Sequence, residues 1–263
     1  MTTAWIETPR GAFRYDLAGQ GEGPPLVLLH EMGGSMESWD AVWADLTAQR
    51  RVLRYDVRGF GQSIKLTGPL AMQDWLDDLA GLLDTLDLTG PIDLAGIALN
   101  GATALAFAAA HPDRVRRVLA SSPATAIPAE RQAGVRDLAD RMEAEGMLPL
   151  AESLFHNYTE PMRQRDPAAF TAFRARWICN DPRSFADTYR MLADLDMEDA
   201  LRSIAVPTRI IGGTHDPLRP PETTRAICDM IPDAEYRELE TGHYFPVQTP
   251  ALCRDTLLEW FAL

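Results

Sequence analysis

The sequence lacks any long hydrophobic run. No apolar stretch approaches the roughly 20 residues that a membrane-spanning helix needs, and the first ten residues do not place an apolar segment after a basic flank, as a signal peptide would. Cysteine is also scarce, because Cys179, Cys228 and Cys253 stand far apart without ligand or redox spacing. We therefore expect no membrane span and no metal, and we expect reduced thiols in a cytoplasmic protein.

Basic charge is the third shortage. The 25 Lys and Arg residues face 38 Asp and Glu residues, which gives a formal net charge of −13. Binding to phosphate groups requires clustered basic side chains. We therefore expect neither nucleic acid nor an anionic membrane as a partner. A small-molecule substrate is the expected partner, no cofactor is implied, and both a monomer and a homodimer remain open.

The remaining composition is that of a globular protein. The chain has 263 residues, of which 46% are hydrophobic and 24% charged, so it can bury a sizeable core. Strand patterns alternate with helical patterns, which predicts an α/β fold with a mostly parallel sheet and right-handed crossovers. We expect a hairpin at 5–17, strands at 26–29, 51–55, 92–95, 115–119, 208–211 and 235–239, and helices at 38–48, 72–86, 99–110, 221–230 and 251–261.

The strand patterns stop between residues 124 and 199. Apolar side chains there recur at helical spacing, as Phe170, Phe173 and Trp177 do. The sequence thus predicts a core domain made of 1–123 and 200–263, interrupted by a helical lid at 124–199. Such an insertion creates a pocket between the lid and the carboxyl ends of the strands.

The sequence has the pattern of a nucleophile elbow, but its nucleophile position does not hold a serine. The run from Leu94 to Gly101 leaves an apolar strand and opens an alanine-rich helix, which is the setting of a G-x-S-x-G nucleophile elbow. Ala98 occupies the nucleophile position. A methyl group cannot attack a carbonyl carbon, so the function depends on the other residues of the site.

Three other segments at strand ends carry chemistry. The turn at 30–34 is glycine-rich and predicts an oxyanion hole formed by the N–H groups of Met32 and Leu99. Asp216 follows the strand at 208–211, and His243 follows the strand at 235–239. We expect His243 to act as a general base that Asp216 orients.

On these residues the chain resembles the α/β-hydrolase superfamily over nearly its whole length. The nucleophile position, the acid and the histidine occur in the family's order, as Ala98, Asp216 and His243. The segment 56–63 is similar to the family's D-x-R-G-x-G-x-S turn. Segments 206–208 and 213–221 look most like the 3-oxoadipate enol-lactonase branch. The resemblance implies an eight-stranded, mostly parallel sheet with helices on both faces and a helical lid.

Two residues depart from the family pattern beside the elbow. Asn100 stands where a small residue is usual, and Glu31 replaces the glycine that usually follows the histidine of the oxyanion loop. Together with Ala98 they favour natural divergence of the site, while a single engineered serine-to-alanine change would explain Ala98 alone. Glu31 either lies at the mouth of the oxyanion hole or points to solvent. The sequence leaves these alternatives open.

Several further residues are candidates for binding the substrate or for structure near it. We expect His30 to hold the oxyanion loop, and we place it with Glu31 and Asn100 among the candidate substrate-binding residues. Ser121 and Ser122 end a strand near the lid, but no nearby group would activate either one, so we expect local hydrogen bonding only. The candidates for the pocket lining are Trp39, His156, Arg174, Arg176 and Trp177. If Arg174 or Arg176 faced inward, the substrate would be expected to carry a carboxylate, but we expect both to lie on the solvent face of the lid.

The sequence supports three functions. The first is a hydrolase-family protein for a small ester, lactone or C–C ketone that lacks its covalent nucleophile, with residual hydrolysis by a water that His243 activates. The second is a non-hydrolytic lyase, isomerase or cofactor-free oxygenase that uses the His243–Asp216 pair as a base. The third is a non-catalytic protein that binds a small ligand.

Overall fold

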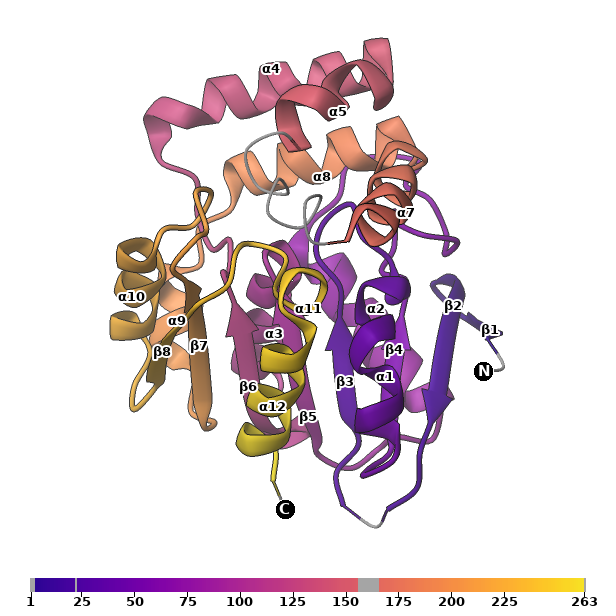
Figure 1. The fold of residues 1–263 in the computed structure, drawn as a ribbon, viewed down its shortest axis with the longest axis vertical. Coiled ribbons are helices and arrows are strands. Elements are labelled where there is room, and N and C mark those ends of the chain that lie inside the picture. Colours follow the sequence, from indigo (N-terminus) through magenta and orange to yellow (C-terminus); the bar gives the residue numbers. More distant parts are fainter. Residues whose placement is uncertain (1–2, 22, 156–165, 263) are drawn as a thin grey trace.

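A single eight-stranded sheet organises the protein (Figure 1). The computed structural model describes residues 3–21, 23–155 and 166–262. The strand order is β1-β2-β4-β3-β5-β6-β7-β8; β1 pairs antiparallel with β2 and β2 with β4, and all the other pairs are parallel. This confirms the predicted fold class. The strands are β1 (Ala4–Thr8), β2 (Gly11–Ala18), β3 (Leu26–Leu29), β4 (Val52–Tyr55), β5 (Ile92–Ile97), β6 (Val115–Ser121), β7 (Thr208–Gly213) and β8 (Glu235–Leu239).

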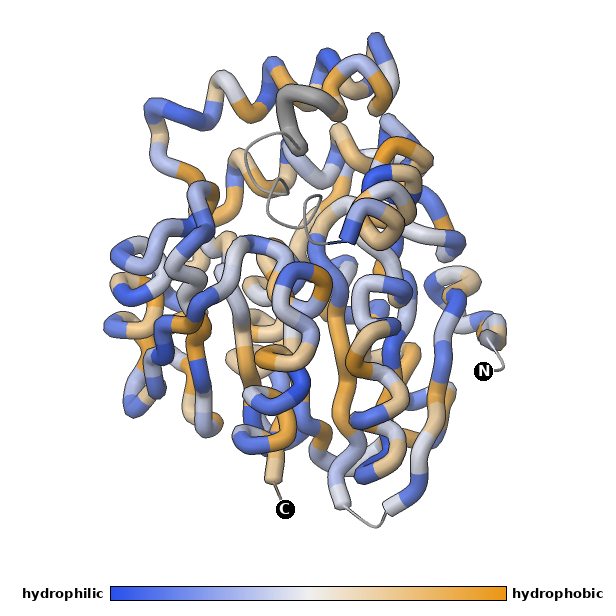
Figure 2. The backbone as a smooth tube through the Cα atoms, in the orientation of Figure 1, coloured by the Kyte–Doolittle hydropathy of each residue, from blue (hydrophilic) through white to orange (hydrophobic). Residues whose placement is uncertain are grey.

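The central strands are hydrophobic because helices cover both of their faces. Every residue of β3 and β5 is buried, and the tube in Figure 2 is hydrophobic along β3. Alternate residues of β3 enter two different clusters: Leu26 and Leu28 pack with α1 and α12, and Val27 and Leu29 pack with α2 and α3. The helices around the sheet are η1 (Met36–Trp39), α1 (Asp40–Thr47), α2 (Met72–Thr85), α3 (Leu99–Ala110), η2 (Pro112–Arg114), α9 (Glu198–Ser203), α10 (Pro221–Met230), α11 (Phe245–Gln248) and α12 (Pro250–Trp260).

Four more helices lie together beyond the carboxyl ends of the central strands (Figure 1). They are α4 (Ala129–Glu145), α5 (Leu148–Phe155), α7 (Pro167–Ile178) and α8 (Pro182–Asp194), and we call them the cap. Helices α7 and α8 both begin at a proline after an aspartate, and the Asp166 and Asp181 carboxylates accept N–H groups of the first turn. Helix α4 packs along α8. The cap therefore forms a layer over the sheet edge where Ala98 lies.

Candidate active site

The turn between β5 and α3 has the sharp geometry of an elbow, with Ala98 at its tip. Ala98 joins β5 to α3 with φ 54° and ψ −122°, a backbone conformation that costs a residue with a side chain roughly 1–3 kcal/mol. A Cβ at Gly96 would lie 2.2 Å from the carbonyl oxygen of Asn100, so only glycine permits this close turn. The methyl group of Ala98 faces a cavity at the N-terminus of α3. The strained turn thus presents the α3 N-terminus to the cavity with no nucleophile on it.

Asp216 and His243 meet as the sequence predicts for an acid and a base. The Nδ1 atom of His243 lies 2.8 Å from Oδ2 of Asp216, and both side chains are buried. The other oxygen of Asp216 accepts the N–H groups of Leu218 (2.9 Å) and Arg219 (3.0 Å). Burial alone would raise the pKa of Asp216, but the charge and hydrogen bond of His243, the Ser122 hydroxyl and the backbone N–H of Arg219 outweigh it and lower that pKa. An ionised Asp216 thus holds Nδ1, and His243 also lines the cavity.

His30 holds the oxyanion loop and does not line the cavity. Its ring is fully buried; Nδ1 lies 2.7 Å from the carbonyl oxygen of Glu31, and Nε2 accepts the Val57 N–H at 3.0 Å. Each ring nitrogen therefore has a backbone partner, which assigns the proton to Nδ1. The side chain of Asn100 donates to the carbonyl oxygen of His30 at 2.5 Å. Both residues support the loop, and neither is among the residues that line the cavity.

Glu31 lies neither at the mouth of the oxyanion hole nor in solvent, the two positions that the sequence left open. It is 1% exposed, and its carboxylate accepts the Ser38 hydroxyl at 2.8 Å. A Cβ at Gly34 would lie 2.3 Å from the same oxygen, so the loop closes tightly around the carboxylate. Glu31 therefore points into the protein behind the oxyanion loop, away from both solvent and the cavity lining.

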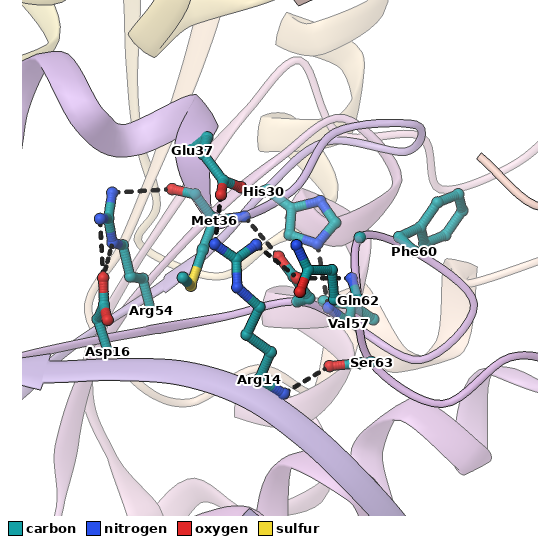
Figure 3. Close-up of polar contacts among 12 residues, drawn as sticks. Arg14, Asp16, His30, Met36, Glu37, Arg54, Val57, Phe60, Gln62 and Ser63 are labelled. Carbon is teal, nitrogen blue, oxygen red and sulfur yellow. Dashed lines mark hydrogen bonds and ion pairs between the residues drawn. The ribbon is translucent and has the colours of Figure 1, made fainter. Parts of the chain in front are cut away.

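The turn after β4 supports the same loop with buried charge (Figure 3). The carboxylate of Asp56 accepts the N–H groups of Met36 and Gln62, each at 2.8 Å, and pairs with Arg14 at 3.2 Å. Arg14 also pairs with Glu37 at 2.5 Å. Burial would raise the pKa of Glu37, but the hydrogen bonds from Arg14, from the Ser35 side chain and from the Glu37 backbone N–H, together with the charge of Arg14, outweigh it and lower that pKa to about 2. We call the five residues Asp56, Met36, Gln62, Arg14 and Glu37 the Asp56 network.

The cavity between cap and core has a volume of about 240 Å³. This is below the roughly 300–1,000 Å³ of pockets for drug-sized ligands, so the cavity suits a small molecule. Its lining is mostly apolar with a few polar groups. The lining residues are Met32, Ala98, Leu99, Ala124, Ile127, Arg131, Val135, Leu138, Trp177, Phe185, Tyr189, Leu192, Leu218, Arg219, His243 and Tyr244.

The sequence identified only part of this lining. Met32, Leu99 and Trp177 line the cavity, whereas Trp39 is fully buried against α1 and α12 and is not among the lining residues. Arg174 and Arg176 are not among the lining residues, and His156 lies outside the described residues. Ser121 and Ser122 are fully buried and do not line the cavity either.

Two lining arginines were missed by sequence reasoning. Arg131 lies in the first turn of α4, and Arg219 lies three residues after Asp216. The second position offered a signal, because a residue so close to the acid must lie near the site. Nothing in the sequence pattern of α4 shows which of its arginines faces the cavity.

The described residues give no sign of a metal centre or of a membrane span. Within 3–21, 23–155 and 166–262, no group of three His, Cys, Asp or Glu side chains is arranged to hold a metal ion. In that same part of the chain, no helix is long and apolar enough to cross a bilayer. The three cysteines are unpaired, and two of them are buried.

Known proteins resemble this chain along most of its length. The family described as serine aminopeptidase, S33, matches residues 13–243. The 3-oxoadipate enol-lactonase 2 of Acinetobacter baylyi is 25% identical over 91% of this chain and 89% of its own length. The 2-hydroxymuconate semialdehyde hydrolase of Pseudomonas sp. strain CF600 is 29% identical over 90% and 87%. The crystal structure of the enol-lactonase of Burkholderia xenovorans LB400 aligns with a TM-score of 0.92 at 27% identity, covering 99% of this chain and all of that one.

Proposed function

The chain belongs to the serine aminopeptidase S33 family within the α/β-hydrolase superfamily, and on that premise we propose that its cavity binds a small ester, lactone or C–C ketone. The relatives named above are hydrolases of lactones and of carbon–carbon bonds. The observation that carries the proposal is the buried His243–Asp216 contact of 2.8 Å beside the elbow at Ala98. The carbonyl carbon of the substrate would lie over the Ala98 methyl group.

The chemistry of the cavity floor supports this binding mode. Met32 and Leu99 both line the cavity, and their N–H groups are the proposed donors to the carbonyl oxygen, where negative charge develops. Because Nδ1 of His243 is held by Asp216, Nε2 is the nitrogen that is free to exchange a proton with the substrate or with water. The site would therefore retain binding, oxyanion stabilisation and proton transfer.

The covalent route is closed in this chain. In an enzyme of this type, loss of the nucleophile costs about 10⁶ in kcat, while the remaining groups keep roughly 10³–10⁴ over water. That loss corresponds to about 8 kcal/mol of transition-state stabilisation. We infer that residual hydrolysis proceeds through a water molecule: His243 takes its proton, the hydroxide attacks the carbonyl carbon, and the leaving oxygen or carbon receives the proton. Turnover that is unchanged in His243→Ala would contradict this route.

The experiment that tests the proposal restores the missing oxygen. This chain and its Ala98→Ser variant are assayed side by side on aryl esters, enol-lactones and dienoic ketones. We expect a gain of several orders of magnitude on at least one class, because only one atom is missing. The double variant Ala98→Ser/His243→Ala is the control, and it should lose that gain. No gain with any class would contradict a disarmed hydrolase.

A second candidate function has its own observation. Glu31 and Asn100 are buried and hydrogen-bonded, with partners in Ser38 and His30, so these departures from the family pattern are built into the loop. Such integration favours a diverged site, in which His243 removes a proton from an acidic C–H or O–H group as a lyase, isomerase or cofactor-free oxygenase would. Turnover of a deprotonatable substrate by this chain, abolished in His243→Ala and unimproved by Ala98→Ser, would identify this function.

A further inference from the structure

Ser122 has a strained backbone at a buried position beside the candidate site. Its φ is 49°, and it is one of four non-glycine residues with positive φ in the part of the chain that the structure describes. Two of the others are Asp87 and Asp233, and aspartate tolerates this left-handed conformation better than most residues do. The remaining two, Ala98 and Ser122, adopt it without such a side chain. Strain of this kind persists where the surrounding structure imposes it, and it gathers at functional sites.

The strained residue lies between the elbow and the acid. It follows β6, the strand between β5, which leads to Ala98, and β7, which leads to Asp216. The N–H group of Ala98 donates to the carbonyl oxygen of Ser121 at 2.9 Å. On the other side, the N–H group of Ser122 donates to the carbonyl oxygen of Ile211 in β7, also at 2.9 Å. The direction of the Ser122 side chain is therefore set by both neighbouring strands.

The Ser122 hydroxyl group is fully buried, and no described residue stands in hydrogen-bond geometry to it. It nevertheless lies close enough to Asp216 to help lower the pKa of that carboxyl group. A buried hydroxyl that lacks a partner is costly, and its O–H bond can rotate to reach an acceptor. The acceptor beside it is the carboxylate of Asp216.

Asp216 has room for one more donor. A carboxylate offers about four lone-pair sites. One oxygen accepts the N–H groups of Leu218 and Arg219, and the other accepts Nδ1–H of His243. The guanidinium group of Arg219 also acts on Asp216 through its charge, but its hydrogen bond goes to the carbonyl oxygen of Leu218. One lone-pair site of the oxygen that faces His243 is thus left for a hydroxyl.

We propose that Ser122 is a positioning residue of the site: its hydroxyl donates a hydrogen bond to Asp216 and holds that carboxylate against Nδ1 of His243. The inference rests on the proposed function, in which this pair moves the proton. Ser122 acts through Asp216 and not on the substrate, because it does not line the cavity. The proposal also gives a reason for the strained φ, which directs the side chain toward the acid.

The pKa of Asp216 tests this role, because it responds to a lost hydrogen bond and not to lost packing alone. Carbon-13 NMR of the aspartate carboxyl groups follows this pKa in the full chain. We expect Ser122→Ala to raise it by about one pH unit, which is the contribution of a hydrogen bond to a charged group. Ser122→Gly removes the same hydroxyl but adopts the positive φ without strain, so it should show the same rise in a more stable protein.

Ser121→Ala is the matched control. Ser121 is the preceding residue, it is fully buried, and its hydroxyl also lacks a described partner, but it is not among the groups that set the pKa of Asp216. The control should therefore leave this pKa unchanged. An unchanged value in both Ser122 variants, or an equal rise in Ser121→Ala, would overturn the proposal.

A second measurement applies if acid unfolds the protein before Asp216 titrates. The unfolding free energy lost in Ser122→Ala should shrink as the pH falls from 7 toward acid unfolding, because a lowered carboxyl pKa stabilises the fold only where the group is ionised. The loss in Ser121→Ala should stay constant, and a constant loss in Ser122→Ala would contradict the hydrogen bond. The proposed function fails by a different result, namely no gain of hydrolysis in Ala98→Ser, and neither titration depends on that activity.

Discussion

The elbow at Ala98 and the Asp56 network lie at the same end of the sheet but are built in opposite ways. In the network, a fully buried carboxylate has three partners, namely two N–H groups and Arg14, and no buried charge there is left alone. At the elbow, a residue with a methyl side chain adopts φ 54° with no polar side chain to gain from it. One region lowers its free energy through its contacts, and the other holds a strained backbone.

This difference shows which part of the site the fold itself requires. The network fixes the chain around η1 and, through Val57 and His30, the oxyanion loop. The elbow fixes only the direction of the α3 N-terminus and of one side chain. We therefore expect a change of side chain at the elbow to leave the fold intact and the loss of a charge in the network to destabilise it. Three substitutions measure the contrast.

The largest effect is expected from Asp56→Ala. Removal of the carboxylate leaves the N–H groups of Met36 and Gln62 without their acceptor and takes from Arg14 one of its two acidic partners. Breaking a buried pair in this way costs about 3–5 kcal/mol of unfolding free energy. Urea denaturation measures the loss. The control is Asp84→Ala, which removes an exposed pair with Arg114 and should cost less than about 1 kcal/mol. Equal losses in the two variants would contradict the role assigned to the network.

Much of the fold could be predicted because its signals are local. Alternating strand and helix patterns predict the sheet, and the expected bounds of α3, α10 and β8 agree with the structure. The pair of Asp216 and His243 was predictable for a related reason, since residues that end neighbouring parallel strands meet at one edge of the sheet. These inferences needed only the period of the pattern and the order of the elements.

The remaining site residues depend on packing that no local pattern records. Trp39 was expected at the pocket, but the side of η1 on which it lies is decided by its contact with α12. Asn100 points to the carbonyl oxygen of His30, a residue 70 positions away in the sequence. The orientation of Arg131 toward the cavity follows from how α4 packs on α8. Such directions require the tertiary structure.

The second prediction concerns Glu37 and pH. Its pKa is lowered to about 2 in the folded protein, from an ordinary value of 4.5. A lowered carboxyl pKa contributes stability above the unfolded value, and that stability is lost as the pH falls through the folded value. We expect Glu37→Gln to lower the unfolding free energy at pH 7 by about 2–3 kcal/mol. As the pH falls from 4.5 to 2, the difference in unfolding free energy between Glu37→Gln and the parent chain should fall to about zero.

Urea denaturation at a series of pH values measures whether this difference in unfolding free energy disappears. Asp84→Asn serves as the surface control, and its difference from the parent should stay below about 1 kcal/mol throughout. A Glu37→Gln difference that persists unchanged at pH 2 would show that the side chain acts by packing, and the contrast between the charged network and the elbow would weaken accordingly.

The smallest expected effect is that of Ala98→Gly, which should raise the unfolding free energy instead of lowering it. Glycine adopts φ 54° without strain, so Ala98→Gly relieves roughly 1–3 kcal/mol, against about 0.5–1 kcal/mol of added entropy in the unfolded chain. Ala98 lines the cavity but is 5% exposed and packs in the core cluster with Trp39 and Phe245, so the packing lost is that of a single methyl group. We expect a net stabilisation of about 1 kcal/mol in urea denaturation. Ala102→Gly, in the same helix but fully buried, should instead destabilise by about 1 kcal/mol or more. If both variants destabilised the protein equally, the backbone at the elbow would hold no strain. The shape of the elbow would then follow from its packing, just as the shape of the Asp56 network follows from its charges.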